Sequence, residues 1–152
     1  MKFILSFSNI PYLCAVGRAL AIDYGTKRTG IAVSDPLRII ATGLDTVHTD
    51  DIFTYLEKYC QEEPVTTFVV GEPLHMDGNP AQIHHMVVGF VRKLQKLFPK
   101  TEVVMQDERF TSENAKEVIR QSGVGRKKRR DKSLIDKISA VLILQDYLEE
   151  TR

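Results

Sequence analysis

Acidic residues stand at three separate places in this chain where a metal-dependent hydrolase would need them. Asp23 ends an apolar run that leads into a glycine turn. Asp107 and Glu108 follow another apolar run and precede an expected helix, and Asp136 stands near the start of the last expected helix. Carboxylates brought together repel one another unless a cation lies between them, and their hard oxygen atoms select Mg²⁺ or Mn²⁺. Such a site can activate water and stabilise both oxygens of a phosphodiester that is being cleaved.

Each acidic motif also has a purely structural interpretation. Asp and Gly are common at strand ends, and acids such as the Asp107-Glu108 pair are favoured near helix N-termini. Ser133-Leu134-Ile135-Asp136 fits a capping box. One helical face, however, would carry Asp136, Ala140, Ile143 and Tyr147. If that face packs on a sheet, Asp136 points inward, and the joint presence of the acids favours the metal site.

Basic residues are concentrated in one short stretch of the chain. Arg126, Lys127, Lys128, Arg129 and Arg130 are consecutive; the net charge is +1, and without these five residues it would be −4. A local cationic segment on a slightly acidic body suits contacts to backbone phosphates, which are salt-sensitive and independent of sequence. Further candidate phosphate contacts stand beside the acids: Lys27, Arg28 and Arg109. The alternative for the basic run is a solvated loop.

Length and composition predict a single domain. A chain of 152 residues that is 43% hydrophobic can bury one substantial core. Cys14 and Cys60 are far apart and form no metal-binding pair, which favours a reducing, cytoplasmic location. No apolar run approaches the ~18 residues of a membrane span, so we expect no membrane association. Residues 1–15 loosely resemble a short signal peptide, but we expect residues 1–16 to be a dispensable extension, followed by one domain at 17–150.

Hydrophobic periodicity predicts an α/β fold. Three strands joined by short links are expected at 18–24, 30–33 and 38–44, with further strands at 67–71 and 102–106. Helices are expected at about 50–62, 79–98, 111–123 and 133–150, with the basic stretch as a loop. Strands linked by helical crossovers should be parallel, and the first three can be antiparallel. The expected architecture is a mixed five-stranded sheet with helices on both faces, which is the element order of RNase H-like domains.

Four motifs in order resemble one known family. They are Asp23-Tyr24-Gly25-Thr26 with Gly30, the loop from Gly71-Glu72-Pro73-Leu74 to Met76-Asp77-Gly78, Asp107-Glu108-Arg109-Phe110-Thr111, and Asp136-Lys137-Ile138-Ser139-Ala140. Together with the basic stretch they look like the YqgF/RuvX family of Holliday junction resolvases and pre-16S rRNA nucleases. The resemblance spans nearly the whole chain. It implies a divalent-metal nuclease with Asp23, one acid of the Asp107-Glu108 pair and Asp136 as ligands.

The resemblance leaves several points open. Alternation along a strand points Asp107 and Glu108 to opposite sides, so the residues alone do not decide which faces the metal. Glu72 resembles the place of a second acid in RuvC-type resolvases, and is otherwise a surface carboxylate. Of the histidines, His75 suits a substrate contact or a solvated position, whereas His84 and His85 suit structural or solvent-facing ones.

The implied substrate is nucleic acid, and the implied enzyme is a nuclease that acts as a monomer or a homodimer. Processing of the 5′ end of pre-16S rRNA is the favoured activity, with resolution of four-way DNA junctions as the alternative. An actin-like phosphate-binding protein would need a second lobe that this chain lacks. An inactive RNA-binding module would need none of the acids.

Overall fold

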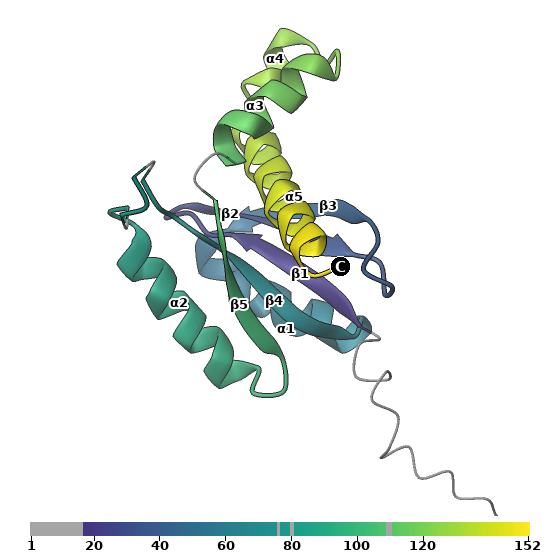
Figure 1. Cartoon of the computed structure of the whole chain (residues 1–152), viewed down its shortest axis with the longest axis vertical. Coiled ribbons are helices and arrows are strands. Elements are labelled where there is room, and N and C mark those ends of the chain that lie inside the picture. Colours follow the sequence, from purple (N-terminus) through teal and green to yellow (C-terminus); the bar gives the residue numbers. More distant parts are fainter. Residues whose placement is uncertain (1–16, 76, 80, 109–110) are drawn as a thin grey trace, which may run out of the picture.

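The computed structural model describes residues 17–152 except 76, 80, 109 and 110 (Figure 1). Five strands form one sheet in the order β3-β2-β1-β4-β5. Their bounds are β1 Arg18–Asp23, β2 Arg28–Ser34, β3 Ala41–His48, β4 Val65–Glu72 and β5 Glu102–Asp107. The pairs β1–β2 and β2–β3 are antiparallel, whereas β1–β4 and β4–β5 are parallel. The expected mixed five-stranded sheet is confirmed.

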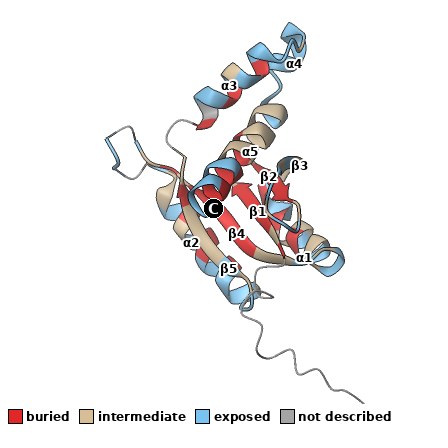
Figure 2. Cartoon of the chain, turned by 45° about the vertical axis from the view of Figure 1, so that its right-hand side comes forward, coloured by how far each residue is buried: buried red, intermediate tan, exposed pale blue. Residues whose placement is uncertain are grey.

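Helices cover both faces of this sheet. After the 3₁₀ turn at Thr49–Asp51 come α1 Ile52–Glu62, α2 His84–Leu97, α3 Thr111–Gln121, α4 Arg126–Arg129 and α5 Lys132–Glu150. Helix α5 crosses one face, and α1 and α2 lie on the other (Figure 1). Helices α3 and α4 extend beyond the sheet at the N-terminal end of α5 (Figure 1). The sheet is therefore the buried middle layer, as the colouring of Figure 2 shows for β1 and β4.

Side-chain size differs between the two faces of β1. Leu20 and Ile22 point into the larger core under α1 and α2, whereas Ala19 and Ala21 face α5. Successive residues of a strand face opposite sides, so Asp23 continues the alanine row on the α5 face. Small residues on that row let the helix approach the strand closely. The sequence of β1 thus places an acid directly beneath the helix that carries Asp136.

Several boundaries differ from those expected from periodicity; β3, for example, ends at His48 rather than at residue 44. Strand β3 begins at Ala41 rather than Arg38, because Arg38 has a φ of 57° and the Asp35 carboxylate accepts hydrogen bonds from the backbone N–H groups of the turn. Helix α2 begins at His84, several residues after Asn79. The basic stretch, expected to be a loop, forms the single helical turn α4.

Within the residues described, no helix combines the length and the apolar character needed to cross a bilayer. The expected extension at 1–16 lies outside those residues.

Candidate active site

The first two candidate acids meet at one edge of the sheet. Strands β1, β4 and β5 are mutually parallel, so their carboxyl ends lie at the same edge, where ligands of open α/β sheets gather. Asp23 is the last residue of β1, and Glu108 directly follows β5. Between them, on β4, is Gly71, where an added Cβ would collide with the Glu108 carboxylate. The glycine thus leaves the space above β4 to that carboxylate.

Asp23 and Glu108 form a hydrogen-bonded pair of carboxyl groups. Burial raises the pKa of Glu108, and the nearby negative charges of Asp23 and Asp107 raise it further. Burial also raises the pKa of Asp23; the hydrogen bond from Glu108 opposes this effect, and the charge of Asp136 adds to it. Two acids this close are stable only if they share a proton or a cation neutralises them. Of the Asp107-Glu108 pair, Glu108 is therefore the acid that faces Asp23.

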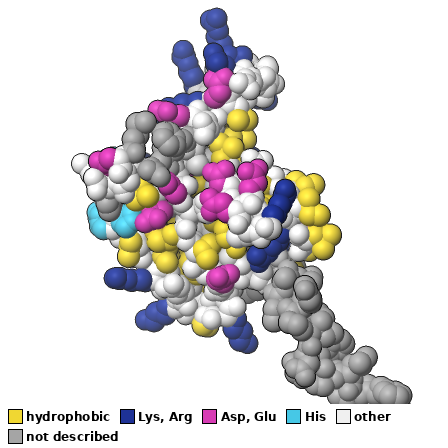
Figure 3. All heavy atoms as spheres, viewed as in Figure 1, with side chains coloured by type: hydrophobic (Ala, Val, Ile, Leu, Met, Phe, Trp, Pro, Cys, Tyr) yellow, Lys and Arg dark blue, Asp and Glu magenta, His cyan; other side chains and the backbone are white. Residues whose placement is uncertain are grey.

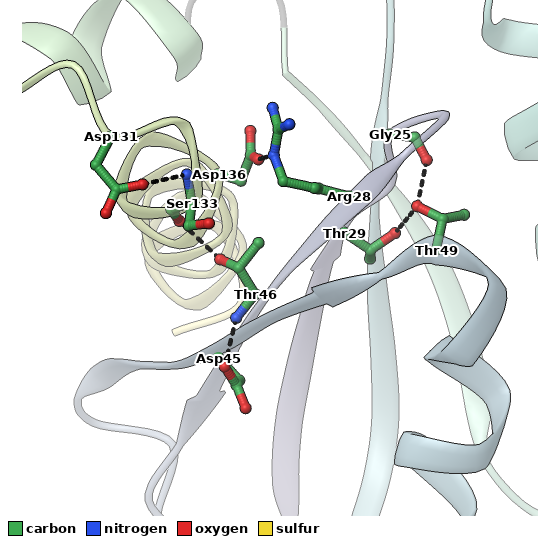
Figure 4. Close-up of polar contacts among 9 residues, drawn as sticks. All are labelled: Gly25, Arg28, Thr29, Asp45, Thr46, Thr49, Asp131, Ser133 and Asp136. Carbon is green, nitrogen blue, oxygen red and sulfur yellow. Dashed lines mark hydrogen bonds and ion pairs between the residues drawn. The ribbon is translucent and has the colours of Figure 1, made fainter.

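Asp136 approaches the same place from α5. Its backbone lies so close to β2 that a Cβ on Gly30 would overlap the Asp136 carbonyl group. Its carboxylate accepts a hydrogen bond from Arg28, with 2.9 Å between Nε and Oδ2 (Figure 4). Helix α5 buries the face that carries Ala140, Ile143 and Tyr147, as the sequence predicts. Asp136, near the start of this helix, lies close enough to Asp23 to influence its pKa.

The start of α5 is fixed by residues other than Asp136. Asp131 is the N-cap, and its carboxylate accepts a hydrogen bond from the backbone N–H of Ser133 at 2.9 Å. The Thr46 hydroxyl of β3 donates to the Ser133 carbonyl oxygen at 2.7 Å (Figure 4). The capping-box interpretation of Asp136 therefore does not hold, since another acid performs the capping.

Glu72 lies apart from Asp23, Glu108 and Asp136, and its register partner on β5 is Asp107. It continues the row of Phe68 and Val70, which pack into the core under α1 and α2. There its Oε1 is 3.0 Å from Nε2 of His84 at the start of α2. Glu72 thus occupies the opposite face of the sheet from Asp23 and Glu108. His84 has a structural partner, consistent with one of the two roles expected for it.

The candidate phosphate contacts fall into two groups. Lys27 and Arg28 lie beside the acids, and Lys27 is exposed. The exposed basic cluster is formed by Arg126, Lys127, Lys128, Arg129 and Arg130. Figure 3 shows dark blue Lys and Arg side chains at the top of the molecule, over α4. Asp136 is four residues into α5, so the helix rise of ~1.5 Å per residue puts it only ~6 Å from the helix start. Arg109 lies outside the described residues.

The acids do not form a ready-made metal site in this structure. Among the residues described, no three His, Cys, Asp or Glu side chains are arranged to hold a metal ion together. The reason lies in two local contacts: Glu108 is hydrogen-bonded to Asp23, while Asp136 accepts a hydrogen bond from Arg28. Sequence patterning identified the acids but did not predict the Arg28–Asp136 pair. The only sequence signal for it was the position of Arg28 two residues before Gly30.

Residues 17–150 match the family described as "RuvX: Holliday junction resolvase". The chain belongs to this RuvX family. Curated relatives include a protein of Porphyromonas gingivalis, 48% identical over 134 residues, which cover 88% of this chain and 97% of that protein. Another, from Flavobacterium johnsoniae, is 45% identical over 135 residues, which cover 89% of this chain and 98% of that protein. Both are described as "Putative pre-16S rRNA nuclease".

The RuvX fold also matches a solved structure of a distant protein. The structure titled "T. thermophilus RuvC in complex with Holliday junction substrate" superposes with a TM-score of 0.55 at 17% identity. The match covers 88% of this chain and 96% of that chain. At this identity the likeness establishes the fold alone. It supports the RNase H-like architecture of this RuvX member, in which Asp23, Glu108 and Asp136 come from two strands and a helix.

Proposed function

We propose that this protein is a metal-dependent nuclease that hydrolyses phosphodiester bonds in the 5′-end processing of pre-16S rRNA. The observation that carries this proposal is the convergence of Asp23, Glu108 and Asp136 at the carboxyl edge of the sheet. The names of the curated relatives support the choice of substrate. The basic cluster on and after α4 supports a nucleic-acid partner.

The donor set fits Mg²⁺ or Mn²⁺. All three candidate ligands are carboxylates, the ligands that hard divalent cations prefer. Burial raises the pKa values of Asp23 and Glu108, and the negative charges of neighbouring acids raise them further, so a bound cation would stabilise the ionised pair. A bound divalent cation would supply polarisation of the phosphoryl oxygen and activation of water.

The chain's own residues would orient the substrate around that place. Arg28, freed from Asp136, would lie within reach of a phosphate beside the acids. Lys27, exposed on the same turn, would add a second cation. The basic cluster would hold the backbone further along the strand, which positions the substrate without reading its sequence. Glu108 and Asp23 would remain beneath the scissile bond.

A nuclease assay with a matched control tests the proposal. Asp23→Asn keeps the side-chain volume but removes one charge, so cleavage should fall by at least two orders of magnitude with the fold intact. Asp51→Asn is the control, because Asp51 is exposed and makes no capping hydrogen bond. Wild-type cleavage by the Asp23 variant would rule out the site.

The family description provides a second candidate activity, resolution of Holliday junctions. The two candidates are separated by offering the purified protein an RNA that carries the precursor 5′ extension and a four-way DNA junction. Both substrates are tested at equal concentration with Mg²⁺ and with Mn²⁺. Preferential cleavage at the mature 5′ end of the RNA is expected. Symmetric cutting of the junction with an uncut RNA would support the second candidate.

A further inference from the structure

A pocket opens on the face of the sheet opposite the three acids. It has a volume of about 340 Å³ and lies between the turn after β1, the start of α1 and the middle of α2. The lining residues that matter here are Tyr24, Asp50, Phe53, Gly89, Phe90 and Lys93. Tyr24 directly follows Asp23 in the chain, so the pocket begins one residue from the candidate active site.

Thr49 ties the pocket to the turn that follows Asp23. Its hydroxyl donates to the Gly25 carbonyl oxygen at 2.6 Å and lies 3.0 Å from the Thr29 hydroxyl (Figure 4). Its backbone N–H donates to the Lys27 carbonyl oxygen at 3.0 Å. Thr49 is buried and itself lines the pocket. These bonds fix Thr49, which lines the pocket, to the turn between β1 and β2 and to the start of β2.

Three aromatic rings, those of Tyr24, Phe53 and Phe90, line the pocket. The Tyr24 and Phe90 ring centroids are 4.8 Å apart, and those of Phe53 and Phe90 are 5.2 Å apart. Phe90 is buried, whereas Tyr24 and Phe53 are partly exposed. Gly89 leaves one side open, because a Cβ built there meets no heavy atom within 4 Å. The exposed parts of the rings are thus available for a planar group to stack on.

Two charges of opposite sign flank these rings. The Lys93 Nζ lies 4.3 Å from the centroid of the Phe53 ring. Asp50 also lines the pocket, and its side chain is 86% exposed. A ligand that is planar, anionic at one end and able to donate hydrogen bonds at the other would match the aromatic rings, Lys93 and Asp50 respectively. A nucleotide has this chemistry: its base stacks, its phosphate pairs with a lysine, and base amino groups donate to a carboxylate.

We propose that this pocket binds one unpaired base of the nucleic acid that is cut at the carboxylates. The inference rests on the proposed nuclease function. The volume lies at the lower end of the ~300–1,000 Å³ range of small-ligand pockets, which suits one nucleoside rather than a longer segment. A flipped or single-stranded base beside the scissile phosphate would fix the position of the cut, because the Thr49 bonds couple the pocket to the turn that directly follows Asp23.

Gly89→Leu tests the pocket without removing any contact of the core. The leucine would fill the open side, and replacing an exposed helical glycine should leave the melting temperature unchanged or raise it. Gly89→Ala is the size control. Lys93→Ala is compared with Lys96→Ala, which removes the same charge from the same helix at an exposed position outside the pocket.

Binding is measured in EDTA, so that no strand is cut, with oligoribonucleotides of about twelve residues. A single abasic nucleotide is moved along the strand. One abasic position should weaken binding to the wild-type protein by roughly fivefold or more, as expected for loss of a stacked base. Gly89→Leu should weaken binding of the intact strand by a similar factor and should remove the loss of affinity caused by the abasic position. Gly89→Ala should retain that loss. Lys93→Ala should weaken binding more than Lys96→Ala does.

The outcomes separate this inference from the nuclease proposal. Strands that bind normally, with no abasic penalty or with a penalty that survives Gly89→Leu, overturn the base pocket and leave the nuclease proposal standing. If the protein binds neither oligoribonucleotides nor oligodeoxyribonucleotides, both the base pocket and the nuclease proposal are overturned. Matching abasic penalties in ribose and deoxyribose strands would support recognition of the base itself.

Discussion

Arg28 on β2 donates a hydrogen bond from Nε to Oδ2 of Asp136 on α5 at 2.9 Å, across 108 positions of sequence. The two side chains are 39% and 24% exposed, so the pair is reachable from solvent. A guanidinium in contact with a candidate metal ligand occupies the place that a divalent cation would take. Arg28 and the cation should therefore compete for Asp136, and nucleic-acid phosphate should relieve the competition by drawing Arg28 away.

Arg28→Gln is expected to tighten divalent-cation binding in the absence of nucleic acid. Partly exposed ion pairs contribute about 0.2–1 kcal/mol, so the dissociation constant for Mn²⁺ should fall by a factor of roughly 1.4 to 5. Titration followed by electron paramagnetic resonance measures this directly. Lys27→Gln, which removes a charge from the neighbouring exposed residue, should change cation affinity less. Weaker Mn²⁺ binding by Arg28→Gln would show instead that Arg28 positions Asp136 for the cation.

Glu108→Gln should stabilise the cation-free protein at neutral and alkaline pH. The pKa of Glu108 is raised on folding, so the folded state holds a proton that the unfolded state releases. The wild-type protein therefore loses stability as pH rises from the ordinary glutamate range towards the raised folded value. Glutamine carries no charge and can still donate a hydrogen bond to Asp23. In thermal melts in EDTA between pH 5 and 9, the melting temperature of Glu108→Gln should exceed that of the wild-type protein by a margin that widens as pH rises.

The same melts supply the controls for that prediction. Glu57→Gln, at an exposed position of α1, should follow the wild-type curve. Saturating Mg²⁺ should raise the wild-type melting temperature more than that of Glu108→Gln, because the variant lacks one ligand charge. A pH-independent gap between the wild-type protein and Glu108→Gln would mean that the shared proton makes no contribution to stability.

Removing the charges of α4 should weaken binding more than turnover. Alanine at Arg126, Lys127 and Lys128 leaves Arg129, whose Nε donates to the Val124 carbonyl oxygen, in place to hold the turn. Each lost phosphate contact should reduce the slope of log affinity against log salt by roughly 0.7–0.9, while kcat at saturating substrate changes little. Alanine at Lys58, Lys96 and Lys100 provides a control of equal charge. A collapse of kcat with unchanged affinity would place these residues at the reacting phosphate.

The sequence was most informative where one local pattern determines one element. The apolar run before the glycine turn predicted the strand with Asp23 at its end, and the helical face shared by Asp136 and Ala140 indicated that Asp136 points inward if that face packs on the sheet. Both follow from backbone periodicity, which is a property of neighbouring residues. The mixed sheet, with antiparallel pairing of the first three strands and parallel pairing of the later ones, followed from the lengths of the connections between the strands.

Features that depend on distant residues could not be predicted in this way. The choice between Asp107 and Glu108 depends on how β5 meets β1 across β4, where Gly71 provides space for one carboxylate. The Arg28–Asp136 pair and the aromatic pocket also combine residues far apart in the chain. Helix α4 was missed because a single turn of four basic residues has no apolar face to reveal it.

Gly30→Ala should separate α5 from the sheet and thereby disturb the acids from a position that touches no substrate. A Cβ there would overlap the backbone carbonyl group of Asp136. Backbone atoms cannot move aside as the end of a flexible side chain can. Overpacking of this kind costs about 1–3 kcal/mol, measured by urea denaturation. Cleavage should fall further than the unfolded fraction explains, because Asp136 would move relative to Asp23. Gly89→Ala, at an open helical position, should be neutral or stabilising. Full activity of Gly30→Ala would show that the distance between β2 and α5 does not control the site.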